Sequence, residues 1–293
     1  CQQSMSMKVP FGIAQMGKSF RNEITTEHFI FRSCEFEQME MEFFVEPGTQ
    51  KGWLNYWRDK RLNWWKSFAN NPDKFIYREH DKDELAHYAD ACYDIEYEYP
   101  WGFDELEGVA SRTDYDLKKH AEHSGAKLSY FDPQKEDPET GKNGWRYTPY
   151  VIEPAAGATR GLLVYLLDAY HEETVKDAKG NDSIRTVMKL HPKLAPIKTA
   201  ILPLVKKEGL PEIARDIVTQ FFKAGINTKY DEQHAIGKRY RRHDEAGTPY
   251  CLTIDGQTKE DGTITIRDRD TMEQERIPAD KAVEIVKERL GEV

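Results

Sequence analysis

The chain has 293 residues, a formal net charge of −9, and 39% hydrophobic and 32% charged residues. This length accommodates two modest domains, and the apolar content is sufficient for a core. No apolar run approaches the roughly 20 residues that a membrane-spanning helix needs. The acidic balance argues against indiscriminate binding of nucleic acid, although a local basic patch remains compatible with RNA binding.

The cysteine spacing argues against a fold stabilised by disulfide bonds or by a bound zinc ion. Cys1, Cys34, Cys92 and Cys251 are far apart and form no Cys-x-x-Cys pair, so we expect neither a zinc site nor a disulfide framework. Reduced thiols in a cytoplasmic protein are the simple interpretation. The first residues carry no basic flank followed by an apolar stretch, so they do not resemble a signal peptide, and we expect the true N-terminus to lie upstream.

The first two thirds of the chain alternate extended and helical patterns. The tryptophans near residue 60 recur at helical spacing, and we interpret them as helix packing rather than as a ligand-binding box. A polar connection over 176–185 precedes the expected domain boundary after residue 192. Strands are expected over 9–23, 29–45, 91–98, 103–111 and 150–154, helices over 52–70 and 157–171, a turn near 25–28 and a surface loop over 132–146.

The last hundred residues predict a small three-layer α/β domain, because strands alternate with helices. The helix over 211–224 has a proline in its first turn and Gly225 after its end, and it places Ile213, Ile217, Val218 and Phe221 on one face. The remaining predicted strands are 198–204, 226–230, 250–255 and 263–267, and the remaining helices are 236–245 and 278–290.

The first strand pair separates charged from apolar side chains. Because strand side chains alternate between faces, each strand should present one chemically distinct row. The opposite face of the second strand, with Met39, Met41, Phe43 and Val45, suits a core. A solvated strand face with ion pairs is the alternative interpretation of the charged rows, which are Gln15, Ser19, Arg21 and Glu23 on the first strand, and Arg32, Cys34, Phe36, Gln38, Glu40 and Glu42 on the second.

These residues lead to a known family. Phe20-Arg21-Asn22-Glu23 followed by Arg32-x-x-x-Phe36 resembles motif 2 of the class II aminoacyl-tRNA synthetases, and Gly157-Ala158-Thr159-Arg160 resembles motif 3. Six blocks in order, GIAQMGKSFRNEI, CEFEQMEMEFF, ELAHYADACYDIE, WGFDELEGVASRTDYDL, YVIEPAAGATR and LAPIKTAILPL, resemble the homodimeric glycyl-tRNA synthetases over essentially the whole chain.

The resemblance implies a fold and an activity. Residues 1–192 would form an α+β catalytic domain built on an antiparallel sheet, and residues 193–293 a small α/β anticodon-binding domain. The activity would be ATP-dependent activation of glycine to glycyl-adenylate, followed by transfer to tRNA(Gly). The complete protein would be a cytoplasmic homodimer that uses ATP with Mg²⁺.

The resemblance also implies roles for individual residues. Arg21 and Arg160 would act in catalysis: Arg21 would hold the ATP α-phosphate, and Arg160 would sandwich the adenine or bind the γ-phosphate. Glu105, with Leu106, would help bind ATP with Mg²⁺, a hard cation that needs oxygen ligands. The other implied ATP-binding residues are Asn22, Glu23 on the adenine amino group, Phe31, Arg32 on the γ-phosphate, Phe36 under the adenine ring, and Gly157.

Glycine offers only an ammonium group, a carboxylate and its small size for recognition. Glu40 matches the family's ammonium-binding carboxylate, and the loop over 153–157 would close the pocket; the implied glycine-binding residues are Phe36, Gln38, Glu40, Glu153 and Gly157. Adenylation needs no general base, because the attacking group is already a carboxylate. We therefore interpret three histidines as structural, namely His87, His120 and His123.

In the C-terminal domain, Lys238, Arg239, Arg241 and Arg242 form a basic stretch that we expect to contact tRNA, with a solvated helix face as the alternative. The chain departs from the family pattern at Cys34, Ala155 and Thr159, where the family often has arginine, serine and an acidic residue. Motif 1 and the Arg-Pro-Glu-Thr-Ala-Gln-Gly block of the family are absent from this sequence, so we expect the isolated chain to be inactive.

Two other functions are alternatives. A non-catalytic, synthetase-derived nucleic-acid-binding protein would have no need of the residues that carry the chemistry, namely Arg21, Glu23, Arg32, Glu40 and Arg160. A prolyl or threonyl synthetase is the third alternative, but threonyl enzymes place a zinc ion in the pocket, and sequence spacing indicates no suitable set of cysteines and histidines here.

Overall fold

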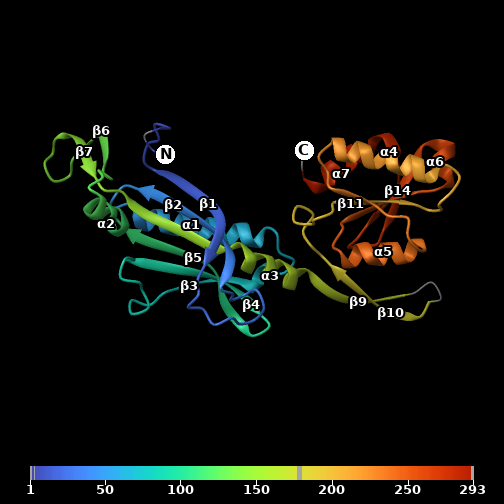
Figure 1. Ribbon diagram of the computed structural model, residues 1–293, viewed down its shortest axis with the longest axis horizontal. Helices are drawn as coiled ribbons and strands as arrows, with labels where there is room; N and C mark the ends of the chain where they lie inside the picture. Colours follow the sequence, from blue (N-terminus) through green and yellow to red (C-terminus); the bar gives the residue numbers. More distant parts are fainter. Residues whose placement is uncertain (1, 3, 177–179, 292–293) are drawn as a thin grey trace. The chain divides into compact units, whose positions relative to one another are not determined.

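The structure of the chain is a computed structural model that describes residues 2, 4–176 and 180–291 (Figure 1). It divides into two compact units. Unit 1 comprises Cys1–Ser67 and Asn71–Val164, and unit 2 comprises Phe68–Asn70 and Tyr165–Val293. Among the described residues, no helix is both long enough and apolar enough to cross a bilayer.

Unit 1 is built on one antiparallel sheet of six strands. The strand order is β1-β2-β8-β5-β4-β3, and every neighbouring pair is antiparallel. This confirms the α+β class expected for the first part of the chain. The strands are β1 (Phe11–Phe20), β2 (Glu35–Val45), β3 (Phe75–Glu79), β4 (Ala91–Tyr99), β5 (Gly102–Thr113) and β8 (Tyr150–Gly157).

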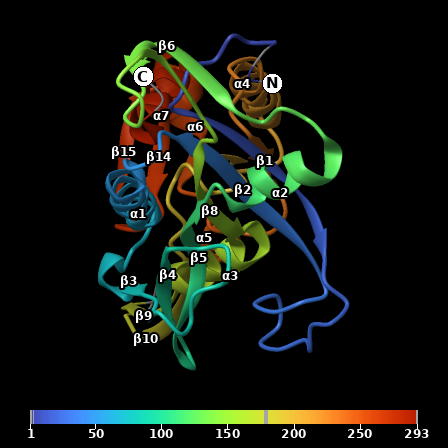
Figure 2. The same cartoon turned by 90° about the vertical axis from the view of Figure 1, so that its left-hand side faces the viewer.

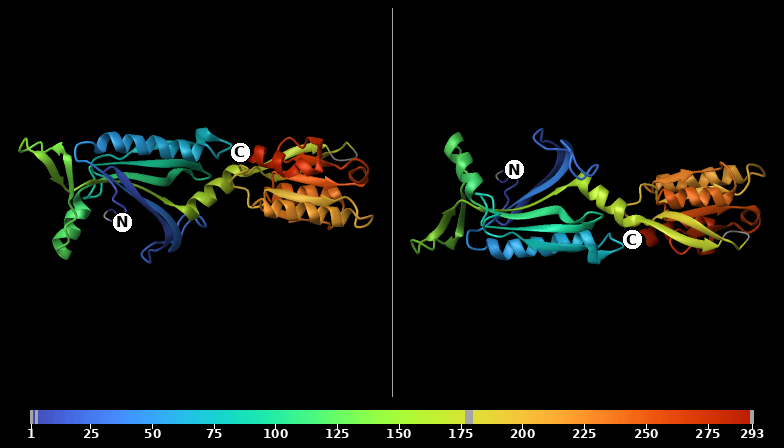
Figure 3. Two further views of the ribbon diagram at one scale, coloured as in Figure 1. Left: turned by 90° about the horizontal axis from the view of Figure 1, so that it is seen from above. Right: turned by 90° about the horizontal axis from the view of Figure 1, so that it is seen from below.

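One face of this sheet is covered by α1 (Gln50–Lys66), which packs against β5 and β8 (Figure 3). Trp53 and Trp57 contact the ring of Phe43, with ring centres 4.9 and 5.2 Å apart. Trp65 is 1% exposed and donates a hydrogen bond to Glu107. The tryptophans therefore pack the helix onto the sheet, as the sequence predicted.

The apolar row of β2 is only partly enclosed. Val45 is fully buried, and Phe43 lies under the α1 tryptophans. Met39 and Met41 instead line a cavity of about 320 Å³ between the first strand pair and α1. The other helices of the region are α2 (Tyr115–Ser124), the short η1 (Pro72–Lys74) and α3 (Ala158–Ala169), in which the division between the two units falls.

The connection between β1 and β2 differs from the expected short turn. β1 ends at Phe20, where the Arg21 amide donates to the Cys34 carbonyl, and residues 22–34 form a longer loop closed by a bridge between Glu27 and Arg32. In Figure 2 this segment is the blue loop beyond the ends of the two strands. The predicted strand faces were therefore wrong for Arg21, Glu23, Arg32 and Cys34, because the chain leaves the strand conformation to pair with itself.

A second correction concerns 132–146, which was expected to be an irregular loop. The segment forms a two-stranded hairpin of β6 (Tyr130–Glu136) and β7 (Asn143–Tyr147). Pro138 and Gly141 lie at its tip, where Gly141 donates to the Asp137 carbonyl, while the flanking aromatic residues lie in the strands. The helix expected over 52–70 ends at Lys66, and β3 and α2 were not predicted.

Unit 2 contains a hairpin and a three-layer α/β fold. The hairpin strands are β9 (Tyr170–Lys176) and β10 (Asp182–Met188); within the connection expected over 176–185, residues 177–179 lie outside the described residues. The remaining elements are β11 (Thr199–Pro203), α4 (Leu210–Lys223), β12 (Thr228–Tyr230), α5 (Ile236–Glu245), β13 (Tyr250–Ile254), α6 (Gly256–Asp261), β14 (Thr263–Asp268), β15 (Gln274–Pro278), η2 (Ala279–Lys281) and α7 (Ala282–Leu290).

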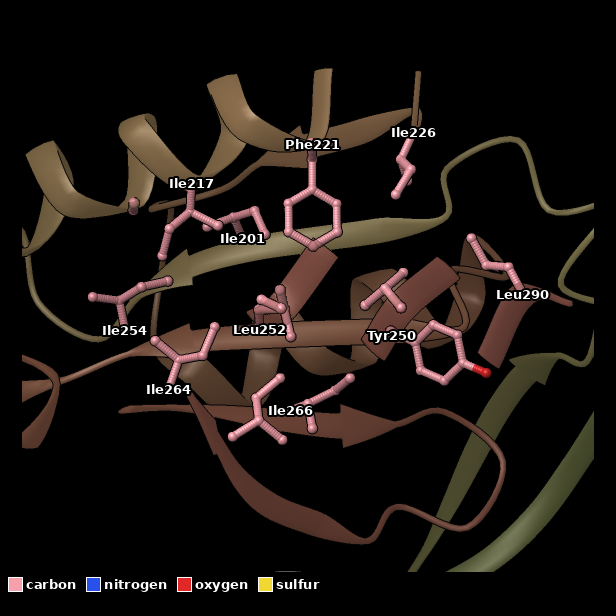
Figure 4. Close-up of a cluster of buried hydrophobic side chains, with 14 of the residues drawn as sticks. Ile201, Ile217, Phe221, Ile226, Tyr250, Leu252, Ile254, Ile264, Ile266 and Leu290 are labelled. Carbon is pink, nitrogen blue, oxygen red and sulfur yellow. The ribbon is translucent and has the colours of Figure 1, made fainter. Parts of the chain in front are cut away.

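The five-stranded sheet has the order β12-β11-β13-β14-β15. β11 is parallel to both β12 and β13, and the other pairs are antiparallel. Ile217 and Phe221 of α4 and Val286 of α7 pack with Ile201 and Leu252 on one face (Figure 4). On the other face, Ala200, Leu202 and Cys251 pack against Ile236 and Tyr240 of α5. This confirms three layers, although α6 and β15 were not predicted.

A buried ion network joins the hairpin to this fold. Arg185 of β10 contacts Asp244 of α5 at 2.9 Å and Glu173 of β9 at 2.7 Å. Asp244 also accepts from Arg267 of β14 at 2.8 Å. The division into two compact units thus places the hairpin in unit 2, whereas the boundary predicted after residue 192 places the hairpin in the first domain. Whether the residues after 192 fold independently stays a prediction.

Candidate functional site

The face of the sheet opposite α1 borders a cavity of about 740 Å³. Side chains from four strands, β2, β4, β5 and β8, reach it because alternate residues of each strand share this face. Strand pairing sets Glu40 of β2 opposite Ala155 of β8, and Ala155 opposite Gly108 of β5. The lining residues expected from the sequence are Arg21, Phe31, Arg32, Phe36, Gln38, Glu40, Glu105, Glu153, Gly157 and Arg160.

One end of the cavity carries two arginines suited to an anion. Arg21 and Arg32 are both exposed, and neither has a carboxylate partner within 4 Å in the described part of the chain. The Arg21 guanidinium lies 5.5 Å from the centre of the Phe36 ring, and Arg32 lies 5.9 Å from that of Phe31. Free guanidinium groups beside aromatic rings can bind phosphates and stack a planar base at the same place.

Arg160 links three parts of this end. It lies in the first turn of α3 and donates to the carbonyl of Phe31 at 3.2 Å and to that of Glu105 at 2.9 Å. Its guanidinium is 4.4 Å from the Phe31 ring centre and 3.3 Å from the Glu105 carboxylate. The helix N-terminus adds favourable partial charge for an anion. The predicted motif 2 and motif 3 arginines are thus brought to one cavity.

The middle of the cavity is acidic. Oxygens of Glu40, Glu42 and Glu153 lie within 4.8 Å of one another. Gln38 donates to Glu40 at 2.9 Å and accepts from Ser19 at 2.9 Å, which fixes the orientation of both side chains. These carboxylates lie on neighbouring strands, so their close approach is a property of the sheet register.

A single guanidinium balances this acidic group. Arg112 of β5 donates to Glu153 at 2.8 Å and to Asp116 of α2 at 2.7 Å. Burial raises the pKa values of both Glu42 and Glu153; Arg112 opposes the rise for Glu153, whereas neighbouring carboxylates add to it. Several carboxyl groups thus compete for one guanidinium, and a small cationic group such as an ammonium would favour their ionised forms.

Arg112 was missed by sequence reasoning, although a signal existed. Gly108, Ala110 and Arg112 alternate along β5, so two small residues and one cation share the cavity face. The Arg112 guanidinium also lies 4.0 Å from the ring centre of Tyr88. Two small residues followed by an arginine on one face of a strand are therefore a sequence pattern that indicates a shallow, charged part of a site.

A second group was not connected by sequence spacing. Nitrogen, sulfur and oxygen atoms of His80, Cys92 and Asp94 lie within 4.8 Å of one another at the cavity wall. His80 is hydrogen-bonded to Asp94 at 2.7 Å, and Arg78 contacts the same carboxylate at 3.3 Å. Burial raises the pKa of the Cys92 thiol to about 12. His80 directly follows β3, and Cys92 and Asp94 lie on β4, so only the pairing of these two strands brings the three residues together.

Several expected site residues lie elsewhere. The Leu106 side chain is fully buried and does not line the cavity, and Asn22 and Glu23 are exposed outside its lining. His87 contacts the rings of Tyr88 and Tyr115, which agrees with a structural role. His120 and His123 are likewise absent from the cavity lining. Among the cysteines, Cys1 lies outside the described residues, while Cys34 donates weakly to the Ile24 carbonyl.

The basic stretch of α5 is not a uniform surface. Arg239 is 2% exposed and donates to the carbonyls of Pro203 and Asp231. Its side chain is therefore not available to RNA, and the prediction that it contacts tRNA was wrong. Arg242 pairs with Asp231 at 2.6 Å, and Arg241 donates to Ser183. Lys238 is exposed. A run of cations on one helix cannot reveal which of them turn inward.

Comparisons with known proteins agree with this arrangement. The family model "Anticodon binding domain" matches residues 198–289. A prolyl-tRNA synthetase from Cryptosporidium parvum, solved with L-proline and AMP, aligns with a TM-score of 0.65 at 19% identity, covering 97% of this chain and 56% of that one. This likeness concerns the fold: a class II catalytic sheet and an α/β anticodon-binding domain.

The sequence relatives are closer. The chain is 51% identical over 288 residues to a glycine–tRNA ligase of Treponema denticola, and 53% identical over 279 residues to one of Nocardia farcinica. These matches cover 98% and 94% of this chain but only 62% and 58% of the relatives, so the chain spans about 60% of their length. Over the part that it spans, the chain is about half identical to glycine–tRNA ligases, and its fold is that of a class II aminoacyl-tRNA synthetase.

Proposed function

We propose that the protein of which this chain is part ligates glycine to tRNA(Gly). Glycine and ATP give glycyl-adenylate and pyrophosphate, and the adenylate then acylates the terminal ribose of the tRNA. The observation that carries the proposal is one cavity that joins two unpaired arginines and aromatic rings to a compact group of carboxylates. The half-identity to glycine–tRNA ligases supports the same substrates.

In this proposal, the arginine end receives ATP. Arg21 binds the α-phosphate, where negative charge builds up as the glycine carboxylate attacks, and Arg32 binds the γ-phosphate. Phe36 stacks against the adenine, with Arg160 on the adenine or the γ-phosphate. Positioning and charge stabilisation supply most of the rate, because the attacking carboxylate needs no general base.

Glu105 is the residue that we assign to ATP-bound Mg²⁺. Its carboxylate is 49% exposed at the cavity and contacts Arg160, so it offers oxygen ligands toward the phosphate end. Bound Mg²⁺ would neutralise phosphate charge during the displacement. The remaining ligands would come from the nucleotide itself.

The acidic middle of the cavity receives glycine. Glu40 and Glu153 face the ammonium group, and Gln38 holds Glu40 in place. The family often has a serine hydroxyl where this chain has Ala155. The carboxylates of Glu40 and Glu153 would therefore contribute a larger share of the glycine-binding free energy. A non-catalytic nucleic-acid-binding module would leave this pairing of free arginines and clustered carboxylates without a purpose. The half-identity to glycine–tRNA ligases favours glycine over proline or threonine.

The complete protein is proposed to be a cytoplasmic homodimer that binds tRNA(Gly) through the domain matched over 198–289. The relatives are longer than this chain by about two fifths of their length. We therefore propose that this chain alone charges tRNA far below the roughly 1–10³ per second of ordinary enzymes. Steady-state charging by the isolated chain at such rates would overturn that part of the proposal.

The test of the substrate uses amino-acid-dependent pyrophosphate exchange by the complete protein. Exchange should require glycine, and exchange driven by proline or threonine instead would overturn the proposed substrate. In Glu40→Gln the KM for glycine should rise roughly tenfold to 150-fold, since a charge-assisted contact contributes about 1.5–3 kcal/mol, while the KM for ATP stays nearly constant. Glu37→Gln, an exposed neighbour on the same strand, is the matched control.

A further inference from the structure

The cavity of unit 1 continues past its acidic middle toward β4 and β3, where His80 lines its wall. Cross-strand pairing sets Glu153 of β8 opposite Ala110 of β5, and Ala110 opposite Cys92 of β4. His80 directly follows β3, and its backbone amide donates to the Cys92 carbonyl at 3.0 Å. One row across the sheet therefore runs from a carboxylate proposed to bind glycine to His80, over about three strand spacings of roughly 4.8 Å each.

The floor between these two side chains is open. Gly108 and Ala110 of β5 both line the cavity there, so the row is interrupted by small residues. Leaving aside its chain neighbours, a Cβ built on Gly108 would meet only one atom within 4 Å in the described part of the chain, which is Oδ1 of Asp94 at 3.9 Å. The cavity therefore has room beside the acidic group for part of a second substrate.

His80 and Asp94 form an oriented pair at the edge of this space. Nε2 of His80 lies 2.7 Å from an Asp94 oxygen, and the Arg78 guanidinium lies 3.3 Å from the same oxygen. Arg78 is held in turn by Glu84 at 2.9 Å and by Glu96 at 3.0 Å. A carboxylate beside one ring nitrogen fixes the tautomer of an imidazole, because the proton lies on the nitrogen that faces it. Asp94 thus assigns the proton to Nε2 and leaves Nδ1 as an acceptor.

Nδ1 is the unoccupied end of this pair. Among the residues that the structure describes, it has no hydrogen-bond partner, and the His80 side chain is 20% exposed where it lines the cavity. The neighbouring Cys92 is not a competing base at neutral pH, because burial raises the pKa of its thiol to about 12. A basic nitrogen open to a substrate cavity, with the other ring nitrogen held by a carboxylate, is the arrangement of a general base.

Only the second step of the proposed reaction calls for such a base. In the first step the attacking group is already a carboxylate, whereas in the second it is a ribose hydroxyl, which must lose its proton as it attacks. Arg21 and Arg32 carry no lone pair for that proton. Glu40 and Glu153 are assigned to the glycine ammonium group, which leaves His80 as an acceptor with no other role.

We propose that His80 is the general base of the transfer step and that Asp94 is its positioning residue. The inference rests on the proposed function. Nδ1 of His80 takes the proton of the terminal ribose hydroxyl while the hydroxyl oxygen bonds to the carbonyl carbon of glycyl-adenylate. The bond from that carbon to the phosphate oxygen breaks, and AMP leaves with this oxygen. The imidazolium then releases its proton to solvent.

The experiment separates the two steps in the complete protein. Enzyme-bound glycyl-adenylate is formed first and is then mixed with tRNA(Gly), and the transfer is followed in a single turnover by rapid quenching. His80→Gln should slow transfer about 10²–10³-fold, while glycine-dependent pyrophosphate exchange, which reports the first step, should change less than about twofold. His123→Gln, at an exposed position of α2 outside the cavity lining, is the matched control and should change neither rate.

The pH dependence of transfer gives a readout that a merely structural role would not move. The transfer rate of the original protein should rise with pH as the imidazole loses its proton, since histidine ordinarily titrates near neutrality. His80→Gln should abolish this rise. Asp94→Asn should slow transfer and move the midpoint of the rise to lower pH, because the carboxylate that favours the imidazolium is gone.

The charged and titratable groups around the imidazole come from several elements. Arg78 of β3, Glu84 of the following loop, and Asp94 and Cys92 of β4 face it directly, and Glu105 and Glu153 act on Cys92 from β5 and β8. Asp94 is the carboxylate in contact with the ring, so its removal should shift the pH profile most.

Four outcomes would contradict the assignment. Transfer by His80→Gln within about threefold of the original rate would leave the proton to another acceptor, such as the adenylate phosphate. Equal losses of exchange and transfer would indicate a defect in folding or adenylation, which circular dichroism would distinguish. Loss of transfer in a zinc chelator, matched by Cys92→Ser, would assign His80, Cys92 and Asp94 to a metal ion. These three results would leave the proposed function standing, whereas exchange that did not require glycine would overturn the proposed function and this inference together.

Discussion

The arginines of the two units have opposite environments. In unit 1, Arg21 and Arg32 are exposed at a cavity and have no carboxylate partner within 4 Å in the described part of the chain. In unit 2, Arg185, Arg239 and Arg269 are 2–3% exposed and are bonded to carboxylates or backbone carbonyls. The same side chain is therefore free to bind an anion in one unit, as we propose for ATP, and holds the fold together in the other.

This difference has an energetic basis. A buried guanidinium must replace its lost water with several acceptors, whereas an exposed one keeps its donors free for a ligand. Sequence density of cations is highest in α5, yet that helix contains the buried Arg239. A high local density of basic residues is thus a poor guide to a binding surface. A better guide is how many of the arginine N–H groups already donate hydrogen bonds within the protein.

The largest effect expected from this comparison is on stability in unit 2. Asp244→Ala leaves Arg185 and Arg267 buried without their shared carboxylate, and breaking a buried pair in this way costs about 3–5 kcal/mol. Urea denaturation followed by circular dichroism should show this loss. Glu245→Ala, at the exposed neighbouring position, should change the free energy of unfolding by less than about 0.5 kcal/mol. Similar losses in both variants would contradict a structural role for the network.

The next effect separates chemistry from stability in unit 1. Arg21→Ala should lower glycine-dependent pyrophosphate exchange by about 10²–10³ in the complete protein, because one preorganised contact to developing charge is lost. Its free energy of unfolding should stay within about 0.5 kcal/mol of the original, since no partner is left unpaired. Lys18→Ala, which removes an exposed cation paired with Glu35 on the same strand pair, is the control. A loss of exchange below about threefold would make Arg21 a bystander.

The smallest effect concerns the crowded carboxylates. Glu42 and Glu153 face Glu40, Arg112 and Asp116, and burial raises the pKa values of both above the ordinary 4.5. The protonated forms are therefore favoured in the folded state, and the stability they contribute is present below about pH 4.5 and is lost as the pH rises through the folded pKa values.

Replacing Glu42 by Gln should reduce the loss of stability that occurs as the pH rises. At pH 8 the melting temperature of the variant should exceed that of the original chain by about 2–4 °C, which corresponds to about 1 kcal/mol in a domain of this size. Near pH 4.5 the two should melt together. Calorimetry at pH 4.5 and pH 8 measures both melting temperatures. A lower melting temperature of the variant at pH 8 would show that a charged Glu42 is paired in the folded protein.

Much of the fold followed from periodicity, and much of the site followed from family resemblance. The alternation in β2 correctly placed Phe36, Gln38 and Glu40 on one face, and the apolar stripe of α4 correctly placed Ile217 and Phe221 in a core. Both patterns depend on one element only. Both predictions held because a strand or a helix has the same periodicity whatever it packs against.

The remainder depended on contacts between distant residues. Arg21 and Arg32 lie in a loop that pairs with itself, and no strand pattern could show where β1 ends. His80 approaches Asp94 only through the pairing of β3 with β4, and Arg239 is buried only because β11 and β12 end beside it. Register and burial are properties of the assembled sheet, and a single sequence specifies them only indirectly.

The network around Asp244 has a consequence for synthesis. Asp244 follows Arg185 by 59 residues, so at about 5–20 residues per second a growing chain waits about 3–12 seconds between making the cation and making its partner. During that interval the β9–β10 hairpin has no anchor in α5. A ribosome that stalled in this window, or a chain cut before residue 244, would present an unsecured hairpin to chaperones and proteases, and quality control would act there first.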